Sequence, residues 1–244
     1  MNIYTTDKIR NVVLLGHGGC GKTSLAEAMA YLAGLTNRMG TVVDGNTISD
    51  YDKEENKRQF SIHTSVIPIP WGDVKVNILD TPGYFDFVGE VEEAVSVADA
   101  AIIVVSGKAG IETGTKRAWK MCEKYKLPRM IFVTDMDIDN ASYRQVVEDL
   151  QELYGKKIAP FHLPIRENEQ FVGYVMSFSR KQNAGMKREK SINLKCRNIP
   201  KKILVFAEML CLRLSRRQAK SLWNAILTGM SFRKMKSDRH CALT

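Results

Sequence analysis

The sequence predicts an α/β fold in which a mostly parallel sheet is covered by helices on both faces. Apolar, strand-like runs alternate along the chain with helical patterns, which favours parallel strands joined by crossover helices. Several of these runs are apolar throughout, as expected of strands that are buried on both faces. The first run leads into a glycine-rich turn that opens a helix. A chain of 244 residues is long enough to bury such a core.

The expected elements follow one another in order. The first strand covers Ile9–Gly16, and the first helix covers Thr23–Leu35. Four more strands are expected at Ser61–Pro68, Val74–Asp80, Ala100–Ser106 and Arg129–Thr134. A turn is expected at Pro70–Asp73. Three more helices are expected at Gly89–Val97, Thr113–Tyr125 and Ala141–Tyr154.

Charge divides the chain near Met176. Residues 177–244 hold 17 Lys and Arg against 3 Asp and Glu, whereas residues 1–176 hold 19 against 24. The formal net charge of +9 therefore describes neither part. No apolar run approaches a membrane span, and the N-terminal residues lack the pattern of a signal peptide. The five cysteines form no CxxC pair, so we expect a cytoplasmic protein with neither a disulfide framework nor a zinc site.

A glycine-rich segment follows the first predicted strand. Its residues Gly16-His17-Gly18-Gly19-Cys20-Gly21-Lys22-Thr23 fit the pattern GxxxxGK[ST]. Such a backbone points its N–H groups at phosphate oxygens, and the helix that begins with Thr23 and Ser24 adds its positive end. Lys22 would reach the β- and γ-phosphates and neutralise charge in the transition state, while the Thr23 hydroxyl would ligate Mg²⁺. The side chains of His17 and Cys20 are expected to be neither ligands nor nucleophiles. The alternative is a glycine-rich turn without a ligand.

Two further motifs stand at the ends of predicted strands. In Asp80-Thr81-Pro82-Gly83, the aspartate can hold Mg²⁺ through water, and Gly83 can donate its N–H to the γ-phosphate and move when that phosphate leaves. In Thr134-Asp135-Met136-Asp137, an aspartate can accept both hydrogen bonds from guanine N1 and N2, which adenine cannot supply. The alternatives are an ordinary turn for the first motif and a strand-to-loop carboxylate for the second.

The ordered motifs GHGGCGKTS, DTPGYFDF and VTDMD resemble those of the translational GTPases, most closely the elongation factor G family and its elongation factor G-like branch. SDYDKEENKRQFSI is similar to the first switch of that family, and YGKKIAPFHLPIRENEQFVGYV to the start of its inserted subdomain. The resemblance implies a P-loop NTPase G domain at residues 1–157, with the inserted subdomain beginning at residues 158–176. It implies a monomer that binds GTP/GDP and Mg²⁺, hydrolyses GTP and acts on the ribosome, with no membrane and no specific DNA as partner.

At the guanine motif and the first switch the chain departs from the family. Asp137 matches the aspartate that specifies guanine, whereas Thr134 and Asp135 replace the usual asparagine and lysine. One lost hydrogen bond would weaken guanine binding by about 1 kcal/mol. Ser61 stands where the family has the threonine that completes the magnesium shell in the GTP state. A serine hydroxyl can fill that role, or Ser61 simply begins a strand.

Tyr84 stands where the family carries a histidine that helps to place the attacking water. A tyrosine hydroxyl can also hydrogen-bond a water, so Tyr84 could still support a slower turnover. The alternative is that its ring packs under the loop with Phe85 and Phe87. The resemblance therefore predicts a GTPase and leaves a binding module without useful turnover as the alternative.

Residues 177–244 form a divergent basic tail that is expected to be poorly ordered. KREKSINLKCRNIPKK and RLSRRQAK are typical of an RNA-binding segment, and a solvated tail is the plainer explanation. A third explanation is a frameshift near residue 176, because synonymous codons for RQAKSLWNAIL read one base out of frame give ETSEELMERYF, which resembles a helix of the inserted subdomain. We also expect the family's last guanine-binding loop, strand and helix to be missing, since nothing after Met176 resembles them. The coding DNA tests the frameshift, which an open alternative frame supports and repeated stop codons contradict.

Overall fold

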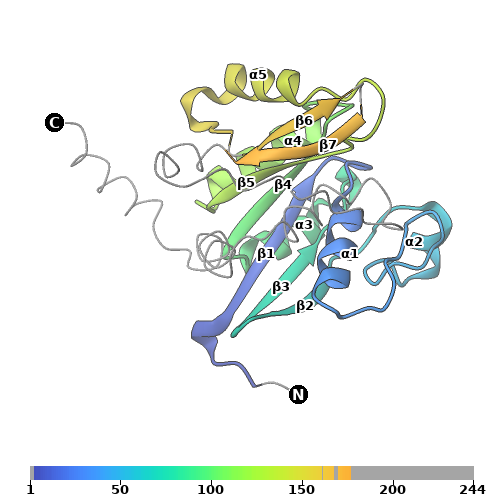
Figure 1. Cartoon of the computed structure of the whole chain (residues 1–244). Coiled ribbons are helices and arrows are strands. Elements are labelled where there is room, and N and C mark those ends of the chain that lie inside the picture. Colours follow the sequence, from blue (N-terminus) through green and yellow to red (C-terminus); the bar gives the residue numbers. More distant parts are fainter. Residues whose placement is uncertain (1–2, 161, 168–169, 177–244) are drawn as a thin grey trace, which may run out of the picture.

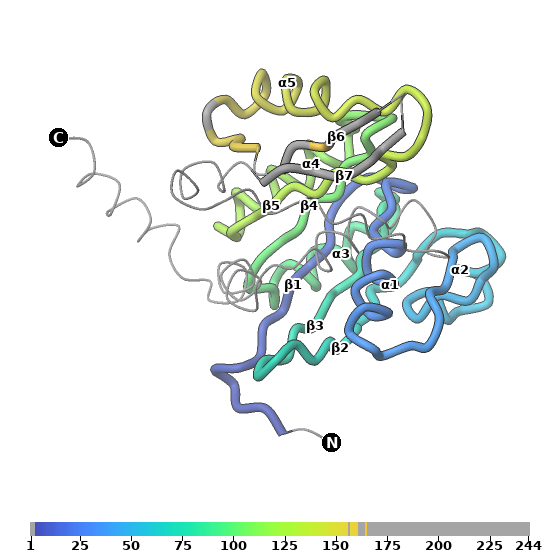
Figure 2. The backbone as a smooth tube through the Cα atoms, in the orientation of Figure 1, coloured from blue at the N-terminus to red at the C-terminus, as the bar shows by residue number. Residues whose placement is uncertain are grey.

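A five-stranded sheet forms the centre of the molecule in the computed structural model, which describes residues 3–160, 162–167 and 170–176 (Figure 1). The strand order is β2-β3-β1-β4-β5. The strands are β1 (Ile9–Gly16), β2 (Ser65–Trp71), β3 (Val74–Asp80), β4 (Ala100–Ser106) and β5 (Arg129–Thr134). β1 pairs in parallel with β3 and β4, β4 pairs in parallel with β5, and β2 is antiparallel to β3. The predicted, mostly parallel sheet is confirmed, and Figure 2 shows β1 in its middle.

Helices cover both faces of this sheet. α1 (Lys22–Leu32) covers one face, and α3 (Val88–Ser96), α4 (Thr113–Lys124) and α5 (Tyr143–Tyr154) cover the other. The short helix α2 (Lys53–Arg58) precedes β2, and 3-10 turns lie at Thr6–Lys8, Phe85–Phe87 and Gly155–Lys157. Successive residues of β1 point to opposite faces, as the pleat requires. Val12 and Leu14 pack with the buried side chains of α1. Val13 and Leu15 pack with those of α3, α4 and α5. The apolar strands are therefore buried on both sides.

The segment before β2 differs from the prediction. The strand expected from Ser61 begins at Ser65, because the N–H groups of Ile62 and His63 donate to a carboxylate of Glu55 and not to a neighbouring strand. It then continues through Pro70 to Trp71, which shortens the expected turn. An edge strand tolerates prolines that a central strand would reject, and β2 lies at the edge.

Helix α2 was not predicted. Asp52 and Glu55 form a capping box, in which the side chain of each accepts a hydrogen bond from the backbone N–H of the other. The first helix ends at Leu32, three residues earlier than expected. The other predicted helices begin or end within two residues of their expected bounds, which is the usual uncertainty at helix ends.

A separate two-stranded sheet follows the central one. It consists of β6 (His162–Glu167) and β7 (Gln170–Met176), which pair antiparallel. The expected start of an inserted subdomain falls on this hairpin, although its boundary at residues 157 and 158 stays a prediction. The basic tail, with its RNA-binding and frameshift hypotheses, lies outside the described residues. Among the described residues, no helix is both long enough and apolar enough to cross a bilayer.

Candidate nucleotide-binding site

The three sequence motifs meet at one edge of the sheet. Gly16 ends β1, Asp80 ends β3 and Thr134 ends β5, and these strands run in parallel in the same sheet. Ligands of open α/β sheets bind beyond the carboxyl ends of their strands. The fold therefore gathers residues that lie far apart in the sequence into a single candidate site.

The glycine-rich segment forms a loop that closes around the Lys22 side chain. Gly21 has a φ of 91°, a left-handed conformation that favours glycine, and it caps the N-terminus of α1. Lys22 is only 6% exposed, and its Nζ donates to the carbonyl oxygen of His17 at 2.8 Å and lies 3.3 Å from that of Gly16. The ammonium group is thus held over the loop, beside the helix N-terminus. This arrangement fits a phosphate cradle.

Two hydroxyl oxygens meet at the start of α1. Thr23 Oγ1 donates to Asp80 Oδ2 at 2.8 Å, and Ser61 Oγ donates to Asp50 Oδ1 at 2.7 Å. The two hydroxyl oxygens stand 3.1 Å apart. Because each hydroxyl gives its single proton to a carboxylate, both can turn lone pairs toward the same space. Neighbouring oxygens in the octahedral shell of Mg²⁺ stand about 3.0 Å apart, so the pair fits that ion.

The negative charges of the two carboxylates that accept from these hydroxyls are not fully compensated by hydrogen bonds. Asp80 Oδ1 and Asp50 Oδ2 are buried, with no partner at hydrogen-bonding distance among the described residues, although Ser49 lies near Asp80. Burial raises the pKa of Asp80 to about 6, against the opposing effects of nearby Lys22 and the Thr23 hydrogen bond. Burial also raises the pKa of Asp50. A bound cation would compensate both charges.

Asp50 is a site residue that the sequence did not reveal. It lies eleven positions before Ser61 in the segment that resembles the first switch, but that segment also carries Asp52, Glu54 and Glu55. Composition alone could not single it out. The hydrogen bond from Ser61 distinguishes it in the structure.

Gly83 lies directly against the phosphate loop. A Cβ atom at Gly83 would stand 2.6 Å from both Gly18 Cα and Lys22 Nζ, so only glycine fits this close approach. The ring of Tyr84 covers Gly18 and lies 4.6 Å from the ring of Phe60, measured between centroids. The residue remains 44% exposed. Tyr84 therefore connects the phosphate loop to the segment that carries Ser61.

The last residue of β5 and the three residues that follow it make different contacts. Thr134 Oγ1 donates to the carbonyl oxygen of Cys20 at 2.8 Å, so its hydroxyl contacts the phosphate loop. Asp135 has a φ of 56° and accepts a hydrogen bond from Ser106 at 2.7 Å. Met136 is buried, while Asp137 Oδ1 is buried without a partner in the described part of the chain. Asp137 thus carries an acceptor whose hydrogen-bonding capacity is not used within the described part of the chain.

The remaining predicted residues support the loop. Thr81 Oγ1 donates to the carbonyl oxygen of Leu14 at 2.6 Å, and Pro82 is buried beside it. His17 Nε2 lies 3.5 Å from Glu112 Oε1. The Cys20 thiol is buried, and burial raises its pKa. These contacts hold the loop against β1 and α4.

The fold and this site define a P-loop nucleotide-binding domain with two switch-like segments, the arrangement of a translational GTPase. The family model described as the elongation factor Tu GTP binding domain matches residues 7–229. The chain therefore belongs to that family.

Individual relatives point to one branch of the family. The chain is 38% identical to ribosome-releasing factor 2, mitochondrial, of Drosophila sechellia over 164 residues, which cover 67% of this chain and 24% of that protein. It is 38% identical to the elongation factor G-like protein of Mycobacterium tuberculosis over 156 residues, or 64% of this chain and 22% of that one. A crystal structure from Thermus thermophilus matches with a TM-score of 0.68 and 42% identity, over 71% of this chain and 26% of that one. These likenesses confirm the elongation factor G resemblance, and the chain spans about a quarter of the relatives' length.

Proposed function

We propose that this domain binds GTP and GDP together with Mg²⁺ and hydrolyses GTP as part of a translation factor that acts on the ribosome. One observation carries the proposal. The hydroxyl oxygens of Thr23 and Ser61 stand 3.1 Å apart beside the phosphate loop, each donating its proton to a buried carboxylate. An apolar turn or an ordinary strand start would need no such convergence of oxygen ligands.

The other residues of the site fit the same function. Lys22 would neutralise phosphate charge, and the N–H of Gly83 would contact the γ-phosphate, since both already lie against the loop. The unpartnered oxygen of Asp137 would accept hydrogen bonds from guanine. Bound Mg²⁺ would supply further charge neutralisation between the phosphates. Thr23, Ser61, Asp50 and Asp80 would hold that ion.

The ribosome is the proposed partner of the whole protein. One relative carries the name ribosome-releasing factor 2 and another the name elongation factor G-like protein. Since this chain matches only about a quarter of either, its contact with the ribosome is proposed from the family and from no residue of the described site.

Nucleotide titration tests the binding step. A fluorescent GDP and a non-hydrolysable GTP analogue should both bind in Mg²⁺, and excess ATP should not displace them. Ser61→Ala should weaken binding of the GTP analogue more than binding of GDP, because Ser61 would ligate Mg²⁺ in the GTP-bound state. Displacement by ATP would favour a P-loop ATPase. Nucleotide affinities that are the same with and without Mg²⁺ would contradict the metal site.

A nucleotide-binding module without useful turnover is the second candidate. It is favoured by Tyr84, which stands at the position of the family's histidine. The Tyr84 ring packs against Gly18 and Phe60. Single-turnover GTP hydrolysis with and without ribosomes separates the two functions. A rate that ribosomes stimulate supports the enzyme, whereas bound GTP that persists in both conditions supports the module. If Tyr84→Phe matches the wild-type rate, the Tyr84 hydroxyl has no part in the reaction.

A further inference from the structure

The chain just after Ser61 is held by a carboxylate on one side. Glu55, which is 1% exposed, accepts hydrogen bonds from the N–H groups of Ile62 at 2.9 Å and His63 at 3.0 Å. Its second oxygen accepts from the N–H of Asp52 at 3.2 Å. A buried carboxylate with three backbone donors is well compensated, so α2 fixes the backbone that follows Ser61.

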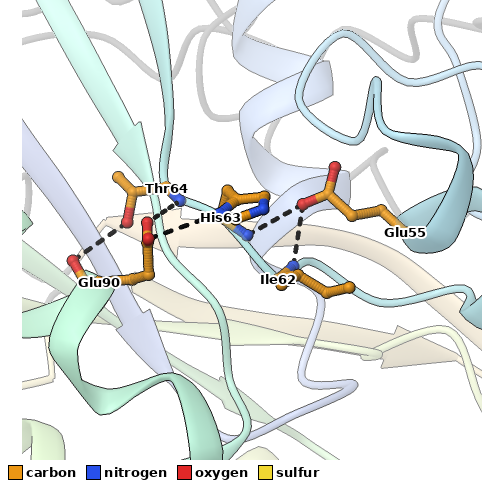
Figure 3. Close-up of polar contacts among 5 residues, drawn as sticks. All are labelled: Glu55, Ile62, His63, Thr64 and Glu90. Atoms are coloured by element: carbon orange, nitrogen blue, oxygen red, sulfur yellow. Dashed lines mark hydrogen bonds and ion pairs between the residues drawn. The ribbon is translucent and has the colours of Figure 1, made fainter.

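A second carboxylate holds the same segment from the other side. Glu90 Oε2 accepts from the N–H of Thr64 at 2.8 Å, and the Glu90 carbonyl oxygen accepts from Thr64 Oγ1 at 3.1 Å. Glu90 Oε1 lies 3.4 Å from His63 Nδ1. Figure 3 shows His63 and Thr64 between Glu55 and Glu90. The Thr64 N–H, followed by the His63 contact, keeps the pKa of Glu90 below its ordinary value, so the carboxylate is charged near neutral pH.

Glu90 belongs to the element that follows the second switch motif. It lies in the first turn of α3, seven residues after Gly83 and six after Tyr84. Gly83 contacts the phosphate loop, and Ser61 contacts Thr23 at the candidate metal site. A displacement of Gly83 that moves the start of α3 would therefore pull on Thr64, three residues from Ser61.

We propose that Glu90 is a positioning residue that couples the segment carrying Ser61 to the segment carrying Gly83 and Tyr84, so that both respond together to the γ-phosphate. The inference rests on the proposed function for its nucleotide response. The coupling itself is a property of the hydrogen bonds between Glu90 and Thr64. Glu55 sets the position of Ser61 within its own segment, whereas Glu90 is the link between the two segments.

The first test needs no nucleotide. Hydrogen exchange of residues 59–66 in the nucleotide-free, full-length chain should speed up in Glu90→Ala, because the Thr64 N–H loses its acceptor. Glu93→Ala is the matched control, since it removes an exposed glutamate from the same helix. Unchanged exchange at residues 59–66 in Glu90→Ala would overturn the coupling, whether or not the protein binds GTP.

The second test uses the GTP analogue and GDP as probes. Glu90→Ala should lower the affinity for the GTP analogue about 5- to 20-fold, which is the effect of losing one partly exposed hydrogen bond to a charged acceptor. GDP affinity should change less than about twofold, and Glu90→Gln should recover part of the loss because its amide oxygen can still accept from Thr64. An equal loss for both nucleotides would show a merely structural role and overturn the proposal.

A double variant tests whether Glu90 acts through Ser61. The losses of GTP-analogue affinity in Ser61→Ala and Glu90→Ala should combine to less than their product, since a residue that positions Ser61 has nothing left to position once its hydroxyl is gone. Fully multiplicative losses would contradict the link. If the wild-type chain binds neither nucleotide, the proposed function fails, while the exchange experiment still decides the coupling.

Discussion

Thr134 donates its hydroxyl hydrogen bond to the carbonyl oxygen of Cys20 at 2.8 Å, and so joins the guanine motif to the phosphate loop across 114 positions of sequence. The same hydroxyl lies 3.2 Å from the carbonyl oxygen of Val105. Gly21 packs on the Thr134 side chain, where a Cβ would stand 3.3 Å from Thr134 Cγ2. Thr134 therefore sets the distance between the parts of the site that would hold the base and the phosphates.

Thr134→Val should weaken the binding of GTP and the binding of GDP to the same degree. The substitution keeps the side-chain shape but leaves the buried carbonyl of Cys20 without its donor, a loss of about 1–2 kcal/mol. This corresponds to roughly a 5- to 30-fold rise in both dissociation constants if the whole cost falls on the bound state. Fluorescent nucleotide titration measures it. A loss confined to GTP would place Thr134 in the γ-phosphate response and contradict its anchoring role.

Most of the fold could be predicted from the sequence because its strands are apolar and bounded by turn residues. β1, β3, β4 and β5 begin and end where the pattern placed them. Helix α2 was missed because its sequence KEENKR has no apolar face, and only the spacing of Asp52 and Glu55 marked its start.

The sequence predicted the residues of the site less completely than it predicted the fold. Gly83, Thr23 and Asp80 carry their role in their own motif, and the structure brings them together. Asp50 and Glu90 act only through contacts with residues many positions away, so no spacing rule could reveal them. Long-range contacts of this kind are fixed by the folded sheet and are invisible in a single sequence.

Gly83→Ala should disable the response to GTP. The added methyl group would stand 2.6 Å from Gly18 Cα and Lys22 Nζ, and the loop backbone cannot move aside as a flexible side chain could. We expect loss of GTP-analogue binding and a destabilisation of about 1–3 kcal/mol from overpacking. Gly89→Ala is the matched control, because a Cβ there meets nothing within 4 Å and helical alanine is more stable by up to about 1 kcal/mol. Normal GTP binding by Gly83→Ala would show that the loop does not approach as closely as described.

Asp137→Ala should remove the preference for guanine. Its buried Oδ1 has no partner among the described residues, so a base can use the acceptor without displacing another bond. Two hydrogen bonds to a charged acceptor are worth about 3 kcal/mol or more together, or a GTP affinity at least about 100-fold weaker. ATP affinity should stay low and unchanged. Competition titrations with both nucleotides measure the ratio, and equal losses for GTP and ATP would mean that Asp137 only supports the loop.

The stability of the metal-free protein should fall as the pH rises past the pKa of Asp80. Burial raises that pKa from its ordinary value of 3.8 to about 6, so the folded protein binds the proton more tightly than the unfolded chain does. The stabilising contribution is therefore complete below about pH 4 and is lost as the pH passes through about 6. Its size is about 2–3 kcal/mol, because a tenfold difference in proton affinity between the folded and unfolded states corresponds to about 1.4 kcal/mol.

Urea unfolding in EDTA between pH 4.5 and 7.5 measures this effect as the difference between the wild type and Asp80→Asn, since groups far from Asp80 titrate equally in both. The wild type should lose about 2 kcal/mol relative to the variant across this range, because part of the contribution is already lost at pH 4.5. Saturating Mg²⁺ at pH 7.5 should restore stability to the wild type and much less to Asp80→Asn, because the ion replaces the proton as the partner of the carboxylate. If the free energies of unfolding of the two proteins change in parallel with pH, the charge of the Asp80 carboxylate is compensated without a proton or a metal ion.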